Sequence, residues 1–391
     1  MRTKYLVAAL SAVALTACTN DEVMEVNRGR GITFQVATEA STRATATTTG
    51  TIDEFTVWGF TTENGENKTL MDALAVTKTG ETWGYTGTIY WPANPVDFYS
   101  VSPTPESGKV SGGTVSIAND AQTISNFTAN TDQSKQVDLL YAVNKGEKKA
   151  DHTASAVSIN FRHALSQIVF KAKNTNDNLK VTIRGVKVGN IKKTGDFTYP
   201  SSSTTTHNAF ENGTITASTQ GTWANVETEE TFAAGITQQT LDGVVSEAVD
   251  LTTKTGAAYS GALFMIPQAL TAWDPETTGA LSPTNKGVYF LVDCQMQSGE
   301  DDVTVWPTAE MDTDEDGYAE VAIPASNLTW DQGKKYVYTF VFGEGGGYEP
   351  GTDPDPDPTL YGINFTVTVD EFINGFDPDD DKEVDMTTGE E

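Results

Sequence analysis

The alternation of apolar and polar positions near the start of the chain predicts a β-strand with one buried face. Ile32, Phe34 and Val36 fall on one side of residues 31–37, and small or polar side chains fall on the other. A period of two residues is typical of a half-buried strand, because successive side chains point to opposite faces of a sheet.

The same apolar pattern recurs near the other end of the chain. Residues 362–369 carry Ile363, Phe365, Val367 and Val369, again in the order Ile-x-Phe-x-Val. Two segments with one face indicate a single groove that either could fill. The first segment would fill it from the same subunit, and the second from a neighbouring subunit.

Short strands and turns are expected between these two segments. Threonine, glycine, valine and aromatic residues are plentiful, and no long segment has the 3.6-residue period of a helix. The expected strands are residues 55–60, 83–85, 89–92, 96–103, 115–117, 138–142, 157–161, 168–173, 181–188, 261–267, 288–292, 318–323 and 336–342. Residues 200–228 are rich in Thr, Ser and Asn, which favours a loop with short hairpins.

This pattern predicts an all-β protein built from β-sandwiches. The 391 residues are enough for two domains that each bury a core of their own. We expect an N-terminal sandwich over residues 31–152 and a C-terminal sandwich over residues 153–344, followed by a linker, a last strand and an acidic tail over residues 345–391.

The first 17 residues predict an export signal. Arg2 and Lys4 give a positive start, and residues 5–15 form an apolar stretch that is too short to span a bilayer. This arrangement is typical of a segment that is removed after export.

Residues 15–18 resemble a bacterial lipobox that ends at Cys18. We therefore expect lipidation of Cys18, a lipidated linker over residues 18–30, and attachment to the outer membrane through the lipid. Acidic residues directly after Cys18 are similar to the surface-export signal of Bacteroidota lipoproteins. An ordinary secretory signal is the alternative.

Charge and cysteine content exclude some classes of protein. The formal net charge of −29 argues against a nucleic-acid partner, because phosphate binding needs clusters of Lys and Arg. It fits an exposed surface protein whose copies repel one another until a specific contact forms. Cys18 and Cys294 are the two cysteines, so no disulfide framework holds the fold if Cys18 carries lipid. Cys294 is expected to be an inert strand residue.

Four stretches together resemble a known family. They are Trp91-Pro92, residues 97–103 with Asp97-Phe98-Tyr99 and Pro103, Asp138-Leu139-Leu140-Tyr141-Ala142, and residues 161–168 with the run Phe-Arg-His-Ala-Leu-Ser-Gln-Ile. They look like the signature of the fimbrillin family, the type V pilin lipoproteins of Bacteroidota. The resemblance implies two tandem transthyretin-like β-sandwich domains. It also implies that a trypsin-like protease cuts after an arginine past the first strand, which releases lipid and strand together.

Arg43 is the expected processing site, with Ala44 as the new N-terminus. Residues 40–47 are small or polar, so the chain there should be exposed and able to enter a protease cleft. Arg28 and Arg30 are rival sites, but cutting at either would leave the first strand attached. A surface arginine in a linker is the alternative interpretation of Arg43.

The segment before the last strand predicts a stiff spacer. Residues 353–358 alternate Asp with Pro, and proline fixes the backbone while like charges repel. About a dozen residues at roughly 3 Å each would carry the last strand some 35–40 Å from the body. This makes residues 362–369 an extended, donor-type strand. The alternative is that they close the subunit's own second sandwich. Residues 377–385 form an acidic, solvated terminus.

No catalytic constellation is apparent in the sequence. His152, His163 and His207 are far apart, and no Gly-x-Ser-x-Gly elbow occurs. His163 is expected to be packed and hydrogen-bonded. Trp58 and Trp91 lie in strand patterns, which favours core positions over a sugar platform.

Asp312, Asp314, Asp316 and Gly317 have the opening spacing of a calcium loop. Position 12 of that loop is Ile323, where a bidentate glutamate is needed, and no flanking helices are apparent. A hairpin turn rich in Asp and Gly explains the motif better. We expect no metal, no cofactor and no enzymatic activity.

The sequence therefore predicts a fimbrial shaft-type subunit, or an anchor subunit that keeps its lipid. Its partners would be other pilin subunits, and it would serve adhesion and colonisation from the cell surface. The main alternative is a glycan-binding surface lipoprotein of a polysaccharide-utilisation system. A tip adhesin is a third class, and it would need a dedicated binding domain. The adhesion ligand is not indicated by any motif.

Overall fold

A computed structural model describes residues 31–36, 52–80, 82–204, 220–255, 258–275, 287–299, 301–309, 311, 313–343, 347–348 and 363–371. Over these residues the regular secondary structure is almost entirely β-strand, with two short 3-10 helices, η1 (Gln133–Lys135) and η2 (Lys149–His152). The all-β prediction is confirmed. Cys18, Arg43, Ala44 and His207, together with the predicted signal segment, lie outside the described residues.

A six-stranded sheet forms the N-terminal part of the described chain, in the order β11-β9-β5-β2-β3-β4. Its strands are β2 (Glu54–Glu63), β3 (Glu66–Thr79), β4 (Thr82–Gly84), β5 (Val96–Ser102), β9 (Leu140–Glu147) and β11 (Arg162–His163). A separate pair, β1 (Phe34–Val36) and β10 (Val157–Ile159), is parallel. Phe98 of β5 lies in the same hydrophobic cluster as this pair, and the next residue, Tyr99, lies in a different cluster. Both faces of the sheet are therefore buried at β5.

A nine-stranded sheet covers the opposite face and continues into the C-terminal part, in the order β20-β19-β13-β8-β7-β6 with β14, β15 and β21 paired at its sides. Its strands are β6 (Lys109–Val110), β7 (Gly113–Ile117), β8 (Gln122–Thr128), β13 (Leu179–Thr198), β14 (Thr222–Ala233), β15 (Gln239–Asp242), β19 (Tyr289–Ser298), β20 (Val303–Trp306) and β21 (Ala319–Pro324). Residues 222–228, expected in a loop, begin β14 instead. Its Thr- and Glu-rich sequence suits a strand with little burial, because β13 supplies the pairing.

The 20-residue strand β13 links the two parts of the molecule. Its first half pairs with β19, from Leu179 opposite Ser298 to Gly189 opposite Tyr289. Its last residues, Thr194 to Thr198, pair with β8. One strand thus serves both cores, and the division of the chain at residue 152 stays a prediction.

The C-terminal core lies between this sheet and a second one, in the order β16-β12-β23-β24 with β17 paired to β12. Its strands are β12 (Ser166–Asn174), β16 (Val245–Asp250), β17 (Leu263–Met265), β23 (Lys334–Phe342) and β24 (Ile363–Glu371), and a short pair is formed by β18 (Gln268–Ala269) and β22 (Thr329–Trp330). Phe170 of β12 lies 5.9 Å from Phe290 of β19, between ring centroids, and stacks on Phe340 of β23. Aromatic contacts of this kind fill the space between two packed sheets.

The last strand, β24, belongs to its own subunit in this structure. It pairs antiparallel with β23 over its whole length, from Ile363 opposite Phe342 to Glu371 opposite Lys334. The expectation that this strand stands away from the body is therefore wrong for the single chain, and the alternative is the one observed. The physical reason is that an apolar face able to fill a neighbour's groove also fits the unpaired edge of β23, next to a hydrophobic core.

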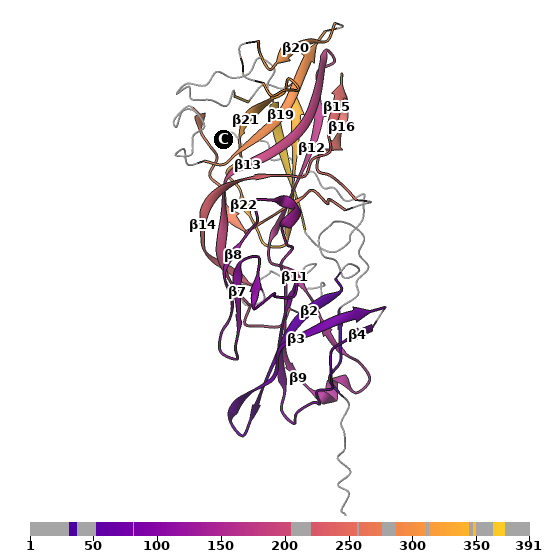
Figure 1. Cartoon of the computed structure of the whole chain (residues 1–391), viewed down its shortest axis with the longest axis vertical. Coiled ribbons are helices and arrows are strands. Elements are labelled where there is room, and N and C mark those ends of the chain that lie inside the picture. Colours follow the sequence, from indigo (N-terminus) through magenta and orange to yellow (C-terminus); the bar gives the residue numbers. More distant parts are fainter. Residues whose placement is uncertain are drawn as a thin grey trace, which may run out of the picture.

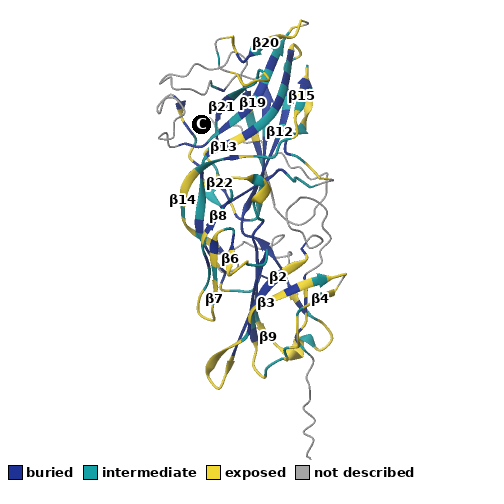
Figure 2. Ribbon diagram, in the orientation of Figure 1, coloured by how far each residue is buried: buried dark blue, intermediate teal, exposed yellow. Residues whose placement is uncertain are grey.

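The molecule is elongated, with β2, β3 and β9 at one end and β15, β19 and β20 at the other (Figure 1). Buried positions run through the middle of the molecule, and exposed positions gather at the hairpins of β3, β4 and β7 (Figure 2). Within the described ranges, no helix has the length and apolar character needed to cross a membrane.

Candidate strand-exchange site

The first strand inserts three apolar side chains into the N-terminal core. Ile32 is 1% exposed, and Phe34 and Val36 are each 4% exposed. Thr33 and Gln35, between them, are exposed to solvent. The predicted strand with one buried face is confirmed, because burial follows the alternation of the sequence.

Phe34 is the centre of an aromatic group. Its ring lies 5.4 Å from Phe98 at 90°, 6.1 Å from Phe55, and 6.1 Å from Tyr85, measured between centroids. Edge-to-face contacts at such distances are the favoured geometry of aromatic pairs. The groove that holds β1 is therefore shaped for an aromatic side chain at this position.

Backbone contacts hold β1 from two sides. On one side β10 runs parallel to it, and the Val157 N–H donates to the carbonyl oxygen of Thr33 at 2.8 Å. On the other side the Ile32 N–H donates to the carbonyl oxygen of Ile89 at 2.8 Å, and the Tyr85 hydroxyl donates to the carbonyl oxygen of Ile32 at 2.7 Å. The strand thus fills a slot between β10 and residues 85–90.

Gly31 permits this close approach. A Cβ at this position would lie 2.8 Å from Cγ2 of Thr88, closer than side-chain carbons come in folded proteins. Without a side chain, Gly31 forms an isolated antiparallel bridge with Tyr90. The glycine therefore lets the start of the strand lie against residues 88–90.

The second Ile-x-Phe-x-Val segment is packed less completely than the first. In β24, Ile363 is fully buried and Val367 is 9% exposed, whereas Phe365 is only half-buried. The Phe365 ring lies 5.5 Å from Phe290 and 5.9 Å from Tyr338. The side chain of Val369 lies outside the described residues. The two segments occupy different cores, so a single chain does not bring them together.

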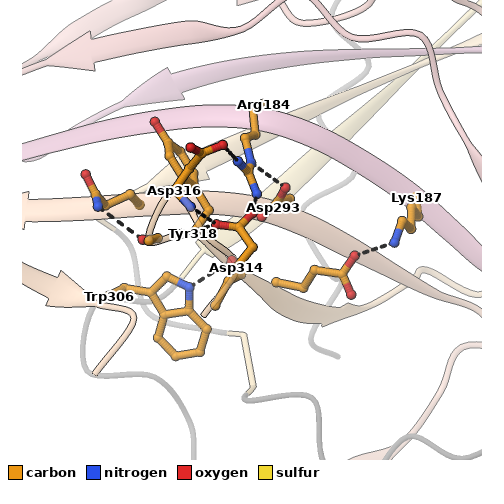
Figure 3. A network of polar contacts seen from close by, with 11 residues as sticks. Arg184, Lys187, Asp293, Trp306, Asp314, Asp316 and Tyr318 are labelled. Atoms are coloured by element: carbon orange, nitrogen blue, oxygen red, sulfur yellow. Dashed lines mark hydrogen bonds and ion pairs between the residues drawn. The ribbon is translucent and has the colours of Figure 1, made fainter. Parts of the chain in front are cut away.

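The Asp-rich turn is held by an arginine that the sequence analysis missed (Figure 3). Asp314 Oδ1 accepts from the N–H groups of Asp316 at 2.9 Å and Tyr318 at 3.0 Å, which confirms a turn. It is not the expected hairpin turn, because β20 before it and β21 after it each pair with β19. Arg184 of β13 pairs with Asp314, with Asp316 at 3.1 Å and with Asp293 at 2.8 Å. The Arg184 guanidinium thus supplies positive charge beside these three carboxylates. Asp312 lies outside the described residues, within which no group of three or more His, Cys, Asp or Glu side chains could hold a metal ion.

Two of the signature stretches meet in the N-terminal part. His163 Nδ1 lies 2.9 Å from Asp138 Oδ1, with both side chains buried, so the expectation for His163 is confirmed. Of the two tryptophans expected in the core, Trp58 is buried as predicted. The other, Trp91, is partly buried, and its ring stacks on the His152 ring at 5.2 Å between centroids. Cys294 is fully buried, which raises the pKa of its thiol and makes it inert.

The packed β-sheets of this chain have the fold of a solved fimbrial protein. The crystal structure of a fimbrial protein from Bacteroides vulgatus ATCC 8482 has a TM-score of 0.55 and 17% identity, and the match covers 88% of this chain and 100% of that one. The fimbrillin-like family model matches residues 42–368, which is most of the chain. The chain therefore belongs to the fimbrillin-like family.

Two further relatives are more distant or match less of the chain. Fimbrium subunit Fim1C of Phocaeicola vulgatus is 25% identical over 221 residues, which are 48% of this chain and 57% of that relative. The match thus spans little more than half of that relative's length. A crystal structure of a candidate cell adhesion protein from Bacteroides uniformis ATCC 8492 has a TM-score of 0.43 and 14% identity, covering 88% of this chain and 98% of that one.

Proposed function

We propose that this chain is a structural subunit of a cell-surface fimbria that polymerises by strand exchange after proteolytic processing. The observation that carries the proposal is the first strand. It buries three apolar side chains in the N-terminal core, and it lies apart from the six-stranded sheet in a two-stranded pair. Membership of the fimbrillin-like family supports the same function.

Processing would separate this strand from the rest of the chain. In the proposal the subunit is exported as a lipoprotein, anchored in the outer membrane through Cys18, and cut between Arg43 and Ala44 by a trypsin-like protease. Arg43 lies between the end of β1 at Val36 and the start of β2 at Glu54. Cutting there leaves β1 and the lipid on one fragment and the folded body on the other.

Loss of β1 would leave an apolar groove that must be filled. Three buried side chains at about 1.5–3 kcal/mol each contribute roughly 5–9 kcal/mol of transfer free energy. An empty groove forfeits this contribution and exposes Phe55 and Phe98, which line it. The cleaved subunit is therefore poised to bind a strand with the same apolar face.

The donor in this proposal is β24 of another subunit, with Ile363, Phe365, Val367 and Val369 in the groove. Phe365 is only half-buried on its own sheet, whereas the matching Phe34 position is 4% exposed. Moving Phe365 into the groove thus increases its burial. The Asp-Pro spacer of residues 353–358 supplies the reach.

Among the described residues, nothing favours the glycan-binding alternative. A sugar platform needs exposed, coplanar aromatic side chains. Of the described large apolar side chains that are exposed, one is aromatic, namely Tyr90 at 44% exposed. The proposal therefore keeps the fimbrial role in adhesion at the cell surface, as a shaft subunit or as an anchor that retains its lipid.

The intact mass of the surface-extracted protein tests the proposal. A mature form that starts at Ala44 is expected, together with a ladder of oligomers on gels of unboiled samples. Arg43→Ala should give a full-length, lipidated monomer without a ladder, because the groove stays filled by β1. Arg28→Ala is the matched control and should be processed normally. Ladders that persist in the Arg43→Ala protein would overturn the assignment of Arg43.

A further inference from the structure

Tyr85 forms a backbone contact with Ile32, two residues before β1, that does not depend on the side chains of the first strand. Its hydroxyl donates to the carbonyl oxygen of Ile32 at 2.7 Å and accepts from the Ile89 N–H at 3.3 Å. Its ring packs 6.1 Å from Phe34 at 56°. Burial raises the pKa of Tyr85, so the hydroxyl keeps its proton and remains a donor at neutral pH.

Tyr85 and Ile89 together bind both backbone groups of one residue. The Ile32 N–H donates to Ile89 and the Ile32 carbonyl accepts from Tyr85. Both contacts lie on the edge of β1 opposite to β10, because Thr33, the next residue, bonds to β10. This side of the slot thus presents one acceptor and one donor in a fixed order.

We propose that residues 85–90 are a wall that reads the backbone of whichever strand occupies the groove, and that Tyr85 is the positioning residue that sets its register and direction. A strand shifted by one residue would turn its apolar side chains out of the groove, because the side-chain period is two. A strand running the opposite way would present carbonyl and N–H in the wrong order. The inference rests on the proposed strand exchange, in which Ile363 takes the place of Ile32.

The test uses the full exported chain, cut with trypsin at Arg43, and two synthetic peptides, residues 31–43 and residues 362–371. Tyr85→Phe keeps the ring that packs on Phe34 and removes only the hydroxyl. It should weaken binding of both peptides by roughly 2- to 12-fold, the factor that corresponds to one net hydrogen bond. Tyr289→Phe is the matched control, because Tyr289 lies in β19, outside the wall, and this variant should bind both peptides as the unmodified chain does.

Direction is tested with a third peptide that carries the sequence of residues 362–371 in reverse order. It has the same composition and the same alternation, and it should bind at least tenfold more weakly than the forward peptide. Equal binding of the reversed peptide would overturn the role of the wall in direction. Unchanged binding of the 31–43 peptide by the Tyr85→Phe protein would overturn the role of Tyr85.

Failure of the proposed function gives a different result. If the unmodified cleaved chain binds the 31–43 peptide but not the 362–371 peptide, strand exchange with β24 is refuted. In that case, weaker binding of the 31–43 peptide by the Tyr85→Phe protein still supports the proposed role of residues 85–90. If the 362–371 peptide binds and Tyr85→Phe weakens only the 31–43 peptide, the wall does not read both strands and the inference fails.

Discussion

Replacing Phe34 with alanine should destabilise the uncut chain and leave the assembled fimbria unchanged. Phe34 is 4% exposed, and its ring contacts the rings of Phe55, Tyr85 and Phe98. Removing a buried phenylalanine costs about 3–5 kcal/mol, the sum of lost transfer free energy and a cavity. The destabilisation cannot exceed the free energy with which β1 binds in the groove, because a larger cost would release the strand from the groove. In the proposed assembly β1 is absent after processing, so the substitution at position 34 would no longer affect the subunit.

Thermal unfolding of the uncut Phe34→Ala protein, with Gln35→Ala as the control, measures the first effect. Gln35 is exposed on the same strand, so its replacement should change the melting temperature little. The second effect is measured on oligomers formed after cleavage, by the temperature at which the ladder on unboiled gels disappears. Oligomers of the Phe34→Ala protein that dissociate at a lower temperature than unmodified ones would refute the reasoning, because β1 would then still be part of the assembled subunit.

Three further predictions concern the C-terminal part of the chain. Val367→Asp should destabilise the single chain by about 3 kcal/mol or more, because it buries a carboxylate against the core. Asn364→Asp, on the exposed face of the same strand, should leave the stability unchanged. Denaturant unfolding compares the two variants. Arg184→Ala should lower the free energy of unfolding by about 1–2 kcal/mol, because it leaves its aspartate partners without their ion pairs. Lys180→Ala, whose ion pair is more exposed, should lower it by under about 0.5 kcal/mol in the same assay. Burial raises the pKa of Tyr336 from 10.0 to about 12. The contribution of the protonated Tyr336 hydroxyl to stability is therefore complete below pH 10, the pKa in the unfolded chain. It is lost as the pH rises from 10 to about 12, the pKa in the folded chain. Tyr336→Phe should melt earlier at neutral pH but lose less stability at alkaline pH, as melting curves across that range would show.

Local patterns in the sequence were sufficient for the features that depend on one segment alone. The burial of Ile32, Phe34 and Val36 follows from a period of two residues, which a strand converts directly into an inner and an outer face. The turn at Asp314 follows from Asp side chains that accept their own neighbouring N–H groups. Neither feature needs information from a distant part of the chain.

Features that depend on pairing between distant segments could not be predicted in this way. The predicted position of β24 was wrong because its apolar pattern fits both the groove of β1 and the edge of β23. Only the fold shows that the edge of β23 is free to pair with it. Arg184 lies 130 residues before Asp314 in the chain (314 − 184), and no local motif links the two. Tyr85 was placed in an expected strand, but its hydroxyl contact with Ile32 requires the fold to bring residues 53 positions apart together.

The pairing of β24 with its own subunit fits the proposed assembly better than a free strand would. A free Ile-x-Phe-x-Val strand would expose apolar side chains and an unpaired backbone, which promotes aggregation before export is complete. On β23 the strand is protected, and Ile363 and Val367 remain buried. During the proposed exchange Ile363 and Val367 would leave one core and enter another, so apart from the gain at Phe365 burial would change little. The driving force for the proposed exchange is the free energy gained when a strand fills the groove that β1 has left. In the uncut chain β1 is tethered and refills the groove at a high effective concentration. In the proposed assembly, β1 after cleavage is a separate fragment held by three side chains and a few backbone bonds, and its loss would make the vacant groove available to the next subunit.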